Sequence, residues 1–258
     1  MIDTGHGPSI VLIPGIQGRW EWMIPTIEAL ARRHRVLSFS VADLPRGDIS
    51  FDAWTRLIDA ALEERGITSG VVAGVSFGGL VAMHYAAVRP SSVAALVVAS
   101  TPSPRWRPDP RTAFYMRWPR LVMPVLVLRS VVRLMPEILA ARPTWKTRLE
   151  LAGAYAWRAI RYPLSATRMV RWTEASLAID LEAECRRVVV PATLITGDRA
   201  LERVVPIEST MEIAHLIPHA QRVVFHGTGH IGCVTSPDRF ADLIDDAIDA
   251  AAARREAS

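Results

Sequence analysis

Short runs of apolar, largely β-branched residues recur along the chain and predict the strands of a sheet. Continuous apolar runs of this length are typical of strands that are buried on both faces, as they are in parallel sheets. The runs are Ser9–Ile13, Arg35–Ser40, Gly70–Val75, Val93–Ala99, Ala192–Thr196 and Gln221–Phe225. We therefore expect a mostly parallel sheet of about six strands.

Helical patterns lie between these runs. Apolar residues recur at every third or fourth position from Phe51 to Leu62, and Gly66 ends this helix. A last helix opens at Thr235 and has Pro237 in its first turn. The alternation of strand and helix predicts a doubly wound α/β fold.

The segment from 101 to 187 interrupts this alternation. It shows helical patterns without a convincing strand, and it holds five of the eight tryptophans. Prolines punctuate these helices at Pro119, Pro124, Pro136, Pro143 and Pro163. We interpret it as a helical insertion above the carboxyl edge of the sheet. The expected division is a core domain of residues 1–100 and 188–258, with a helical cap of residues 101–187.

Composition and charge change this picture only in the insertion. A chain of 258 residues with 50% hydrophobic and 22% charged residues is ordinary for a globular protein. Residues 101–187 carry sixteen Lys and Arg against seven Asp and Glu, although the whole chain carries only +4. A solvated basic face is the simpler interpretation, and attraction of an anionic partner or of a membrane surface is the alternative. No nucleic-acid-binding motif is recognisable, so we do not expect that partner.

The cysteines and apolar stretches argue against several other classes of protein. Cys185 and Cys233 cannot form a disulfide framework, and they have no zinc-ligand spacing. The longest apolar stretch is broken by Pro124, and no signal peptide is recognisable at the N-terminus. We expect a cytoplasmic protein without stable membrane insertion.

A G-x-S-x-G pattern follows the third predicted strand. Gly74, Ser76 and Gly78 lie between that strand and a helical pattern, which is the context of a nucleophile elbow. Such a turn holds the serine above the sheet, and the amides of the next helix favour a developing oxyanion. The turn from Pro14 to Gly18 opens towards the same edge and offers further amides.

A nucleophilic serine needs a base and an acid that orients it. His230 lies in the glycine-rich stretch after the last predicted strand, and His226 is the weaker candidate. A metal pair of these two histidines is less expected, because no third ligand is near. For the acid, Asp198 and Glu202 both follow the fifth strand. The residues themselves leave that choice open.

Together these residues resemble the α/β-hydrolase superfamily, and they follow its chain order of Ser, acid and His. The resemblance implies that Ser76 is the nucleophile and His230 the base, with the amides of Ile16 and Phe77 as the oxyanion hole. The family's acid loop often reads Asp-Arg-Val-Val-Pro, and here the stretch from Glu202 to Pro206 aligns with it, which favours Glu202 over Asp198. The stretch 43–50 resembles a family loop beside the pocket.

Four departures from the family are visible. Pro14-Gly15 replaces the usual His-Gly pair, and the acid is a glutamate in a loop with two extra residues. The N-terminal antiparallel strands are nearly absent. Ile231 follows His230, where many carbon–carbon bond hydrolases have tryptophan.

The resemblance implies a carboxylesterase that cleaves small to medium esters through an acyl-enzyme, without a metal or other cofactor. A carbon–carbon bond, lactone or thioester hydrolase is the enzymatic alternative, and a non-catalytic receptor is the other. Gln17, Trp118, Leu121 and Ile231 are the expected substrate-binding residues. We expect a monomer or a homodimer.

Overall fold

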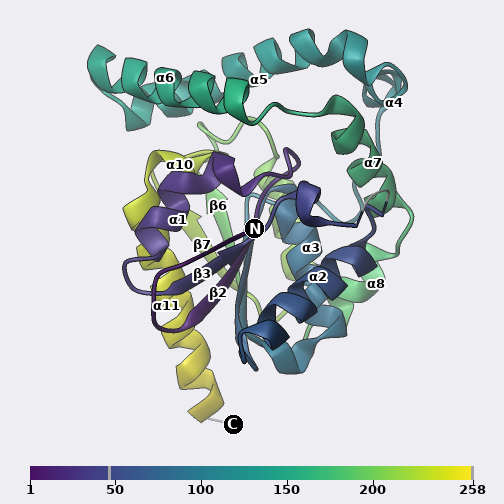
Figure 1. Cartoon of the computed structure of the whole chain (residues 1–258), viewed down its shortest axis with the longest axis vertical. Coiled ribbons are helices and arrows are strands. Elements are labelled where there is room, and N and C mark those ends of the chain that lie inside the picture. The colour runs from purple at the N-terminus through teal and green to yellow at the C-terminus, as the bar shows by residue number, and fades with distance from the viewer. Residues whose placement is uncertain (46–47, 257–258) are drawn as a thin grey trace.

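A seven-stranded sheet forms the centre of the computed structural model, which describes residues 1–45 and 48–256 (Figure 1). The strand order is β1-β3-β2-β4-β5-β6-β7. The strands are β1 (Ile2–Thr4), β2 (Ser9–Ile13), β3 (Arg35–Ser38), β4 (Gly70–Val75), β5 (Val93–Ala99), β6 (Ala192–Gly197) and β7 (Gln221–Phe225). All neighbours are parallel except β1 and β3, so the doubly wound α/β prediction is confirmed.

The strand that the sequence did not predict is β1. It is only three residues long and pairs antiparallel with β3, Ile2 opposite Ser38. Arg35 and Arg65 both donate hydrogen bonds to Asp3, which fastens this edge strand by charge rather than by apolar burial. Hydropathy could not reveal it, because no residue of β1 is fully buried.

Helices cover both faces of the sheet. One face packs against α2 (Phe51–Glu64), α3 (Phe77–Val88), α8 (Leu181–Arg186) and α9 (Ile207–Leu216). The other packs against α1 (Ile24–Leu30), α10 (Gly232–Thr235) and α11 (Pro237–Glu256). The strands contribute alternate residues to both faces, Val11 to the first and Ile10 to the second. Burial on both faces is why the strands appear as continuous apolar runs. Short 3-10 helices are η1 (Trp20–Met23), η2 (Val41–Asp43) and η3 (Pro90–Ser92).

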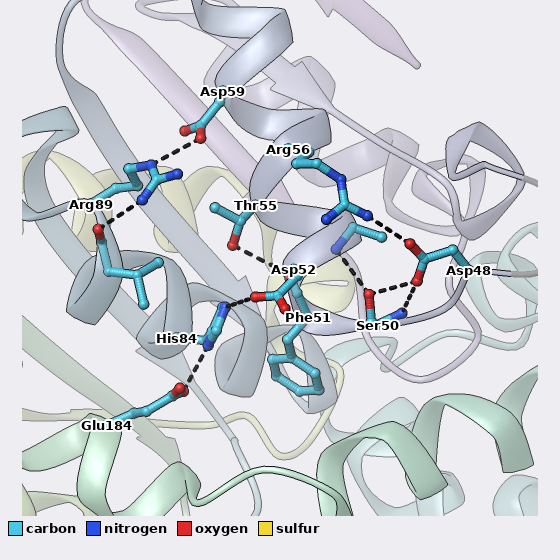
Figure 2. Close-up of polar contacts among 12 residues, drawn as sticks. Asp48, Ser50, Phe51, Asp52, Thr55, Arg56, Asp59, His84, Arg89 and Glu184 are labelled. Atoms are coloured by element: carbon cyan, nitrogen blue, oxygen red, sulfur yellow. Dashed lines mark hydrogen bonds and ion pairs between the residues drawn. The ribbon is translucent and has the colours of Figure 1, made fainter.

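Polar contacts fasten α3, the helix that follows the G-x-S-x-G turn. Figure 2 shows His84 of α3 between two acids, with Nδ1 2.7 Å from Glu184 of α8 and Nε2 3.9 Å from Asp52 of α2. At the end of α3, Arg89 donates a hydrogen bond of 2.9 Å to Asp59 of α2. These bonds fix the orientation of α3 against the sheet.

The loop before α2 ends in a helix cap. Ser50 accepts a hydrogen bond from the amide of Ala53, and Asp48 accepts one from the Ser50 hydroxyl (Figure 2). Ser50 therefore satisfies an orphan amide of α2. Arg46 and Gly47, in the middle of the stretch that resembles a family loop, lie outside the described residues.

Among the described residues, α4 to α8 connect β5 to β6, and the first four of these helices lie over one end of the sheet (Figure 1). They are α4 (Pro110–Arg117), α5 (Pro119–Ala141), α6 (Trp145–Arg161) and α7 (Ala166–Leu177). Trp172 of α7 is fully buried, with its ring centroid 5.4 Å from that of Trp54 and 4.8 Å from that of Phe77. This aromatic cluster joins α7 to the core.

Two of the prolines expected to punctuate helices lie inside α5 instead. Pro119 is at the start of α5, whereas Pro124 and Pro136 lie within it. A proline in a helix removes one backbone donor. Pro136 therefore leaves the carbonyl of Val132, four residues earlier, without its usual helical donor, and Val132 is exposed to solvent. Among the described residues, no helix is both long and apolar enough to cross a bilayer.

Candidate active site

Ser76 occupies a strained turn between β4 and α3. Its φ of 54° is in the left-handed region, which is uncommon for a residue other than glycine. The flanking glycines make this turn possible. A Cβ on Gly74 would lie 2.4 Å from the carbonyl oxygen of Gly78, and one on Gly78 would lie 2.3 Å from that of Ile13. The amide of Ser76 donates to the carbonyl of Ala99 at 2.8 Å, which fixes the turn against β5.

His230 reaches Ser76 from the loop between β7 and α10. Its Nε2 lies 3.1 Å from the Ser76 Oγ, within hydrogen-bond distance. Its Nδ1 lies 3.3 Å from the Oε1 of Glu202, the distance of an ion pair rather than of a short hydrogen bond. The structure therefore aligns a hydroxyl, an imidazole and a carboxylate from three loops that follow β4, β7 and β6.

Glu202 is buried and held by its own loop. Its Oε1 also accepts hydrogen bonds of 3.0 Å from the amides of Val204 and Val205. Burial raises the pKa of Glu202, but the contact with His230, its charge and the two amides outweigh that effect. The net effect holds that pKa below its usual value. The carboxyl group is consequently ionised when it faces the imidazole at neutral pH.

Asp198, the alternative acid, belongs to a different pair. One of its oxygens lies 3.1 Å from the Nδ1 of His226, and the other accepts a hydrogen bond from the amide of Gly227. His226 is largely exposed, and its ring contacts Asp198 rather than Ser76. No set of three His, Cys, Asp or Glu that could hold a metal ion occurs among the described residues.

The turn after β2, which holds the predicted oxyanion-hole residue Ile16, lies beside Ser76. A Cβ on Gly15 would lie 3.3 Å from the Cβ of Ser76, so this backbone packs directly against the serine. The amide of Gly18 closes the turn on the Gly15 carbonyl at 2.8 Å, leaving Ile16 and Gln17 at its tip. Phe77 is the first residue of α3, where amides have no carbonyl partner within the helix.

The predicted substrate-binding residues are scattered. Gln17 and Ile231 are half-buried beside the residues just described. Trp118, at the junction of α4 and α5, is about half exposed. Leu121 does not line the site as predicted, because its side chain is 74% exposed. The next residue, Val122, is the one that is buried. An apolar residue in α5 does not have to face inward, and the sequence pattern alone could not assign the side.

Glu137 of α5 is a site residue that the sequence did not reveal. Its side chain is fully buried, and its Oε2 accepts a hydrogen bond of 3.0 Å from the amide of Ile231. The Thr235 hydroxyl donates to its Oε1 at 3.3 Å, and the amide of Gly229 also donates to the carboxylate. The carboxylate thus bonds amides on both sides of His230.

Burial raises the pKa of Glu137, more than the amides of Ile231 and Gly229 and the charge of His230 lower it. The only available sequence signal was chemical. Glu137 is the sole acid in α5, a helix whose other residues are apolar or basic except for Ser130.

Comparisons with known proteins identify similar sequences and similar folds. The model of the family described as "Alpha/beta hydrolase family" matches residues 10–243. A putative carbamate hydrolase RutD from Stutzerimonas stutzeri is 28% identical, over 93% of this chain and 91% of the relative. A pimeloyl-[acyl-carrier protein] methyl ester esterase from Xanthomonas campestris pv. campestris is 27% identical, over 93% and 94%.

Solved structures show the same fold. A hydrolase from Pseudomonas aeruginosa PA01 aligns with a TM-score of 0.75 at 20% identity, over 96% of this chain and 92% of that one. The enol-lactonase from Burkholderia xenovorans LB400 aligns with a TM-score of 0.70 at 20% identity, over 96% and 95%.

Proposed function

The chain belongs to the alpha/beta hydrolase family, and from that premise we propose that it is a serine hydrolase that cleaves carboxylic esters through an acyl-enzyme. The observation that carries this proposal is the alignment of Ser76, His230 and Glu202 at distances of 3.1 and 3.3 Å. A receptor would not need this arrangement.

Each member of the triad has one task in the proposed reaction. The Ser76 Oγ attacks the ester carbonyl while His230 Nε2 takes its proton, and the imidazolium then protonates the departing alcohol. Water, deprotonated by the same imidazole, attacks the acyl-enzyme and releases the acid and Ser76. Glu202, ionised at neutral pH, orients the ring through Nδ1 and stabilises the imidazolium.

The amides of Ile16 and Phe77 stabilise the tetrahedral oxyanion in this proposal. Their support is the packing of the Gly15 backbone on Ser76 and the position of Phe77 at the start of α3. In comparable sites one donor contributes roughly 3 kcal/mol to transition-state stabilisation. Gln17 and Ile231, beside these groups, are the proposed contacts to substrate.

We assign Glu137 as a positioning residue for His230. It accepts hydrogen bonds from the amides of Gly229 and Ile231, and therefore restrains the loop on both sides of the base. The carboxylate does not touch Ser76 or the reacting atoms. It links α5 to the loop that carries the base, so the inserted helices support the catalytic geometry.

The proposed substrate class is a small or medium acyl ester. One relative is named as an esterase of a methyl ester, which is in keeping with acyl transfer to water. The cytoplasmic location, the monomeric or homodimeric state and the division into a core and a helical cap remain predictions of the sequence.

Hydrolysis of p-nitrophenyl esters of increasing acyl length tests the proposed function. We expect turnover in the wild type, loss of turnover in Ser76→Ala, and wild-type rates in Ser130→Ala, where the replaced serine is exposed and bonds only within α5. Equal rates in the wild type and Ser76→Ala would contradict the proposal. The acyl length with the highest kcat/KM measures the acyl pocket.

A further inference from the structure

The apolar side of α5 faces away from the molecule. Val122 and Glu137 are buried and mark its inward side. The opposite side carries an exposed apolar row at alternating spacings of four and three residues, which keeps the row on one face of a helix. We call this row the outward stripe; its members are Leu121, Val125, Leu128, Val132, Met135 and Leu139.

Helix α6 presents a similar face. Trp145, Leu149 and Ile160 recur near one side of the helix and are all strongly exposed, Ile160 by 76%. Tyr155, on another side, reaches inward and donates a hydrogen bond to the carbonyl of Trp22. Figure 1 shows α5 and α6 in one layer over this end of the molecule.

This concentration of exposed apolar side chains is local. Among the described residues, fourteen of the eighteen large hydrophobic side chains that are exposed lie between Phe114 and Ile160. A monomer rarely exposes a continuous apolar patch of this kind without a binding role. The outward stripe and the exposed side of α6 therefore point to an occupant that covers them.

The charge of these helices selects among possible occupants. Residues 110–161 contain ten Lys and Arg and only two acids, and one of these acids, Glu137, is buried. A second copy of the chain would bring two such cationic faces together, which like-charge repulsion opposes. An anionic occupant is favoured.

We propose that the outer face of α4–α6 binds the surface of a membrane that contains anionic lipids. Helices with apolar side chains on one side and arginines around them lie flat at the boundary between headgroups and acyl chains. Arg120 and Arg129 are exposed and flank the outward stripe, one on each side, and their aliphatic stems can lie over it while the guanidinium groups reach the headgroups. An acidic protein would match the arginines but would leave a continuous aliphatic row to be covered.

The exposed tryptophans fit the same interface. Trp118, Trp145 and Trp157 are all more than half exposed. An indole combines an apolar ring with one N–H donor and favours the boundary between water and hydrocarbon. Binding in the plane of the membrane surface needs no spanning helix.

Sedimentation of the full chain with vesicles tests this proposal. We expect binding to phosphatidylcholine vesicles that contain phosphatidylglycerol, little binding to phosphatidylcholine alone, and weaker binding as ionic strength increases. No binding to the phosphatidylglycerol vesicles at low ionic strength would overturn the proposal.

Paired variants distinguish vesicle binding by the outer face from non-specific adsorption. Leu128→Glu should weaken vesicle binding roughly ten-fold or more, because it removes an apolar contact and adds an anion. Its control is Val189→Glu, which makes the same charge change at a residue that is 72% exposed, compared with 65% for Leu128. Arg120→Gln should weaken binding about five-fold, whereas Arg222→Gln, on β7, should have little effect. Equal weakening within either pair would overturn the proposal.

Two further measurements exclude the other occupants. In sedimentation velocity without lipid, a wild-type dimer that Leu128→Glu converts to a monomer would assign the face to a second copy. Binding to an acidic polypeptide such as polyglutamate, with no binding to the vesicles, would assign it to an acidic protein. Hydrolysis of a water-soluble ester should be the same in Leu128→Glu as in the wild type, so failure here is distinguishable from failure of the proposed reaction.

Discussion

Two regions of the molecule differ in which groups they bury. The carboxyl edge of the sheet buries charged groups, whereas the outer face of α4–α6 exposes apolar ones. At the edge, Glu202 and Glu137 are buried with amide partners and His230 is nearly so. On the outer face, aliphatic residues such as Leu128 are open to solvent. Helix α5 belongs to both regions, since one side holds the histidine loop and the other carries the outward stripe.

The burial of side chains must therefore be explained separately for the two sides of α5. Buried carboxylates are costly unless they are bonded, so their presence marks a site that the fold maintains. Exposed aliphatic rows are also costly in water, so their presence marks a surface that meets another phase or molecule. Substitutions in each region test whether the two regions are as distinct as their burial implies.

The largest expected effect is at the base. His230→Ala should lower kcat/KM for an ester by roughly 10^4-fold or more, because the serine loses its proton acceptor. Circular dichroism should show an unchanged fold. The comparison variant is Leu128→Glu, which should retain the wild-type rate. A similar loss of kcat/KM in both variants would show that the two regions are not functionally distinct.

The choice of acid gives the next largest effect. Glu202→Gln should reduce kcat by roughly 10^3- to 10^4-fold, since the imidazolium loses its anionic partner. Asp198→Asn should stay close to the wild type, because Asp198 contacts His226 and the Gly227 amide instead. Steady-state kinetics of both variants check this, and the reverse ranking would show that Asp198 is the acid.

Two tryptophan substitutions compare the contributions of a buried and an exposed side chain to the free energy of unfolding. Trp172→Ala should lower the free energy of unfolding by about 3–5 kcal/mol, because it empties a buried site between Trp54 and Phe77. Trp157→Ala, at a residue that is 65% exposed, should change it by about 0.5 kcal/mol or less. Urea titrations measure both, and equal destabilisation would mean that Trp157 is packed in solution.

The smallest expected change in rate is at Glu137. Glu137→Gln should lower kcat by about ten-fold with little change in KM, the range seen when outer partners that orient a site are lost. Glu137→Asp should restore part of the rate, because it keeps an acceptor for the two amides. A changed KM with an unchanged kcat would indicate a substrate contact rather than a positioning role.

The pH dependence of stability provides a direct check on the buried state of Glu137. Because its folded-state pKa is raised, the folded protein binds more protons than the unfolded chain between the usual Glu pKa and the raised value. Wild-type stability should therefore fall, relative to Glu137→Gln, as pH rises through that window. Thermal unfolding at a series of pH values measures the difference, and parallel curves would show that the carboxyl group is not buried as described.

Glu202 gives the opposite sign. Its pKa is lowered in the folded state, so its contribution is present above the usual Glu pKa and is lost as pH falls through the lowered value. The same unfolding series with Glu202→Gln should show the stability advantage of the wild type shrinking in acid. A constant advantage at all pH values would contradict the ion pair with His230.

The sequence predicted the fold where its signals are local. The six apolar runs and the G-x-S-x-G turn need only a few consecutive residues, and the family and fold that they indicated are confirmed. Strand β1 was not predicted because it is short and its pairing with β3 is stabilised largely by Asp3 and two arginines. Pro124 and Pro136 were expected to punctuate the helices, but α5 continues through both of them.

The contacts of the site could not be predicted in the same way, because the residues that form them are distant in sequence. Asp198 and Glu202 follow the same strand, and only the turn in which the Glu202 amide bonds the Asp198 carbonyl decides which one faces His230. Glu137 lies 94 residues before Ile231, its hydrogen-bond partner, so no local pattern joins them. The side of α5 on which Leu121 lies depends on how the whole helix packs, which hydropathy alone does not specify.

The most direct test of the central claim is to find the residue that becomes acylated or phosphonylated. We would label the wild type, Ser76→Ala and His230→Ala with a fluorophosphonate and map the adduct by peptide mass spectrometry. We expect one adduct on Ser76 in the wild type, none in Ser76→Ala, and much slower labelling in His230→Ala. An adduct on another residue, or labelling of Ser76→Ala at the wild-type rate, would contradict it.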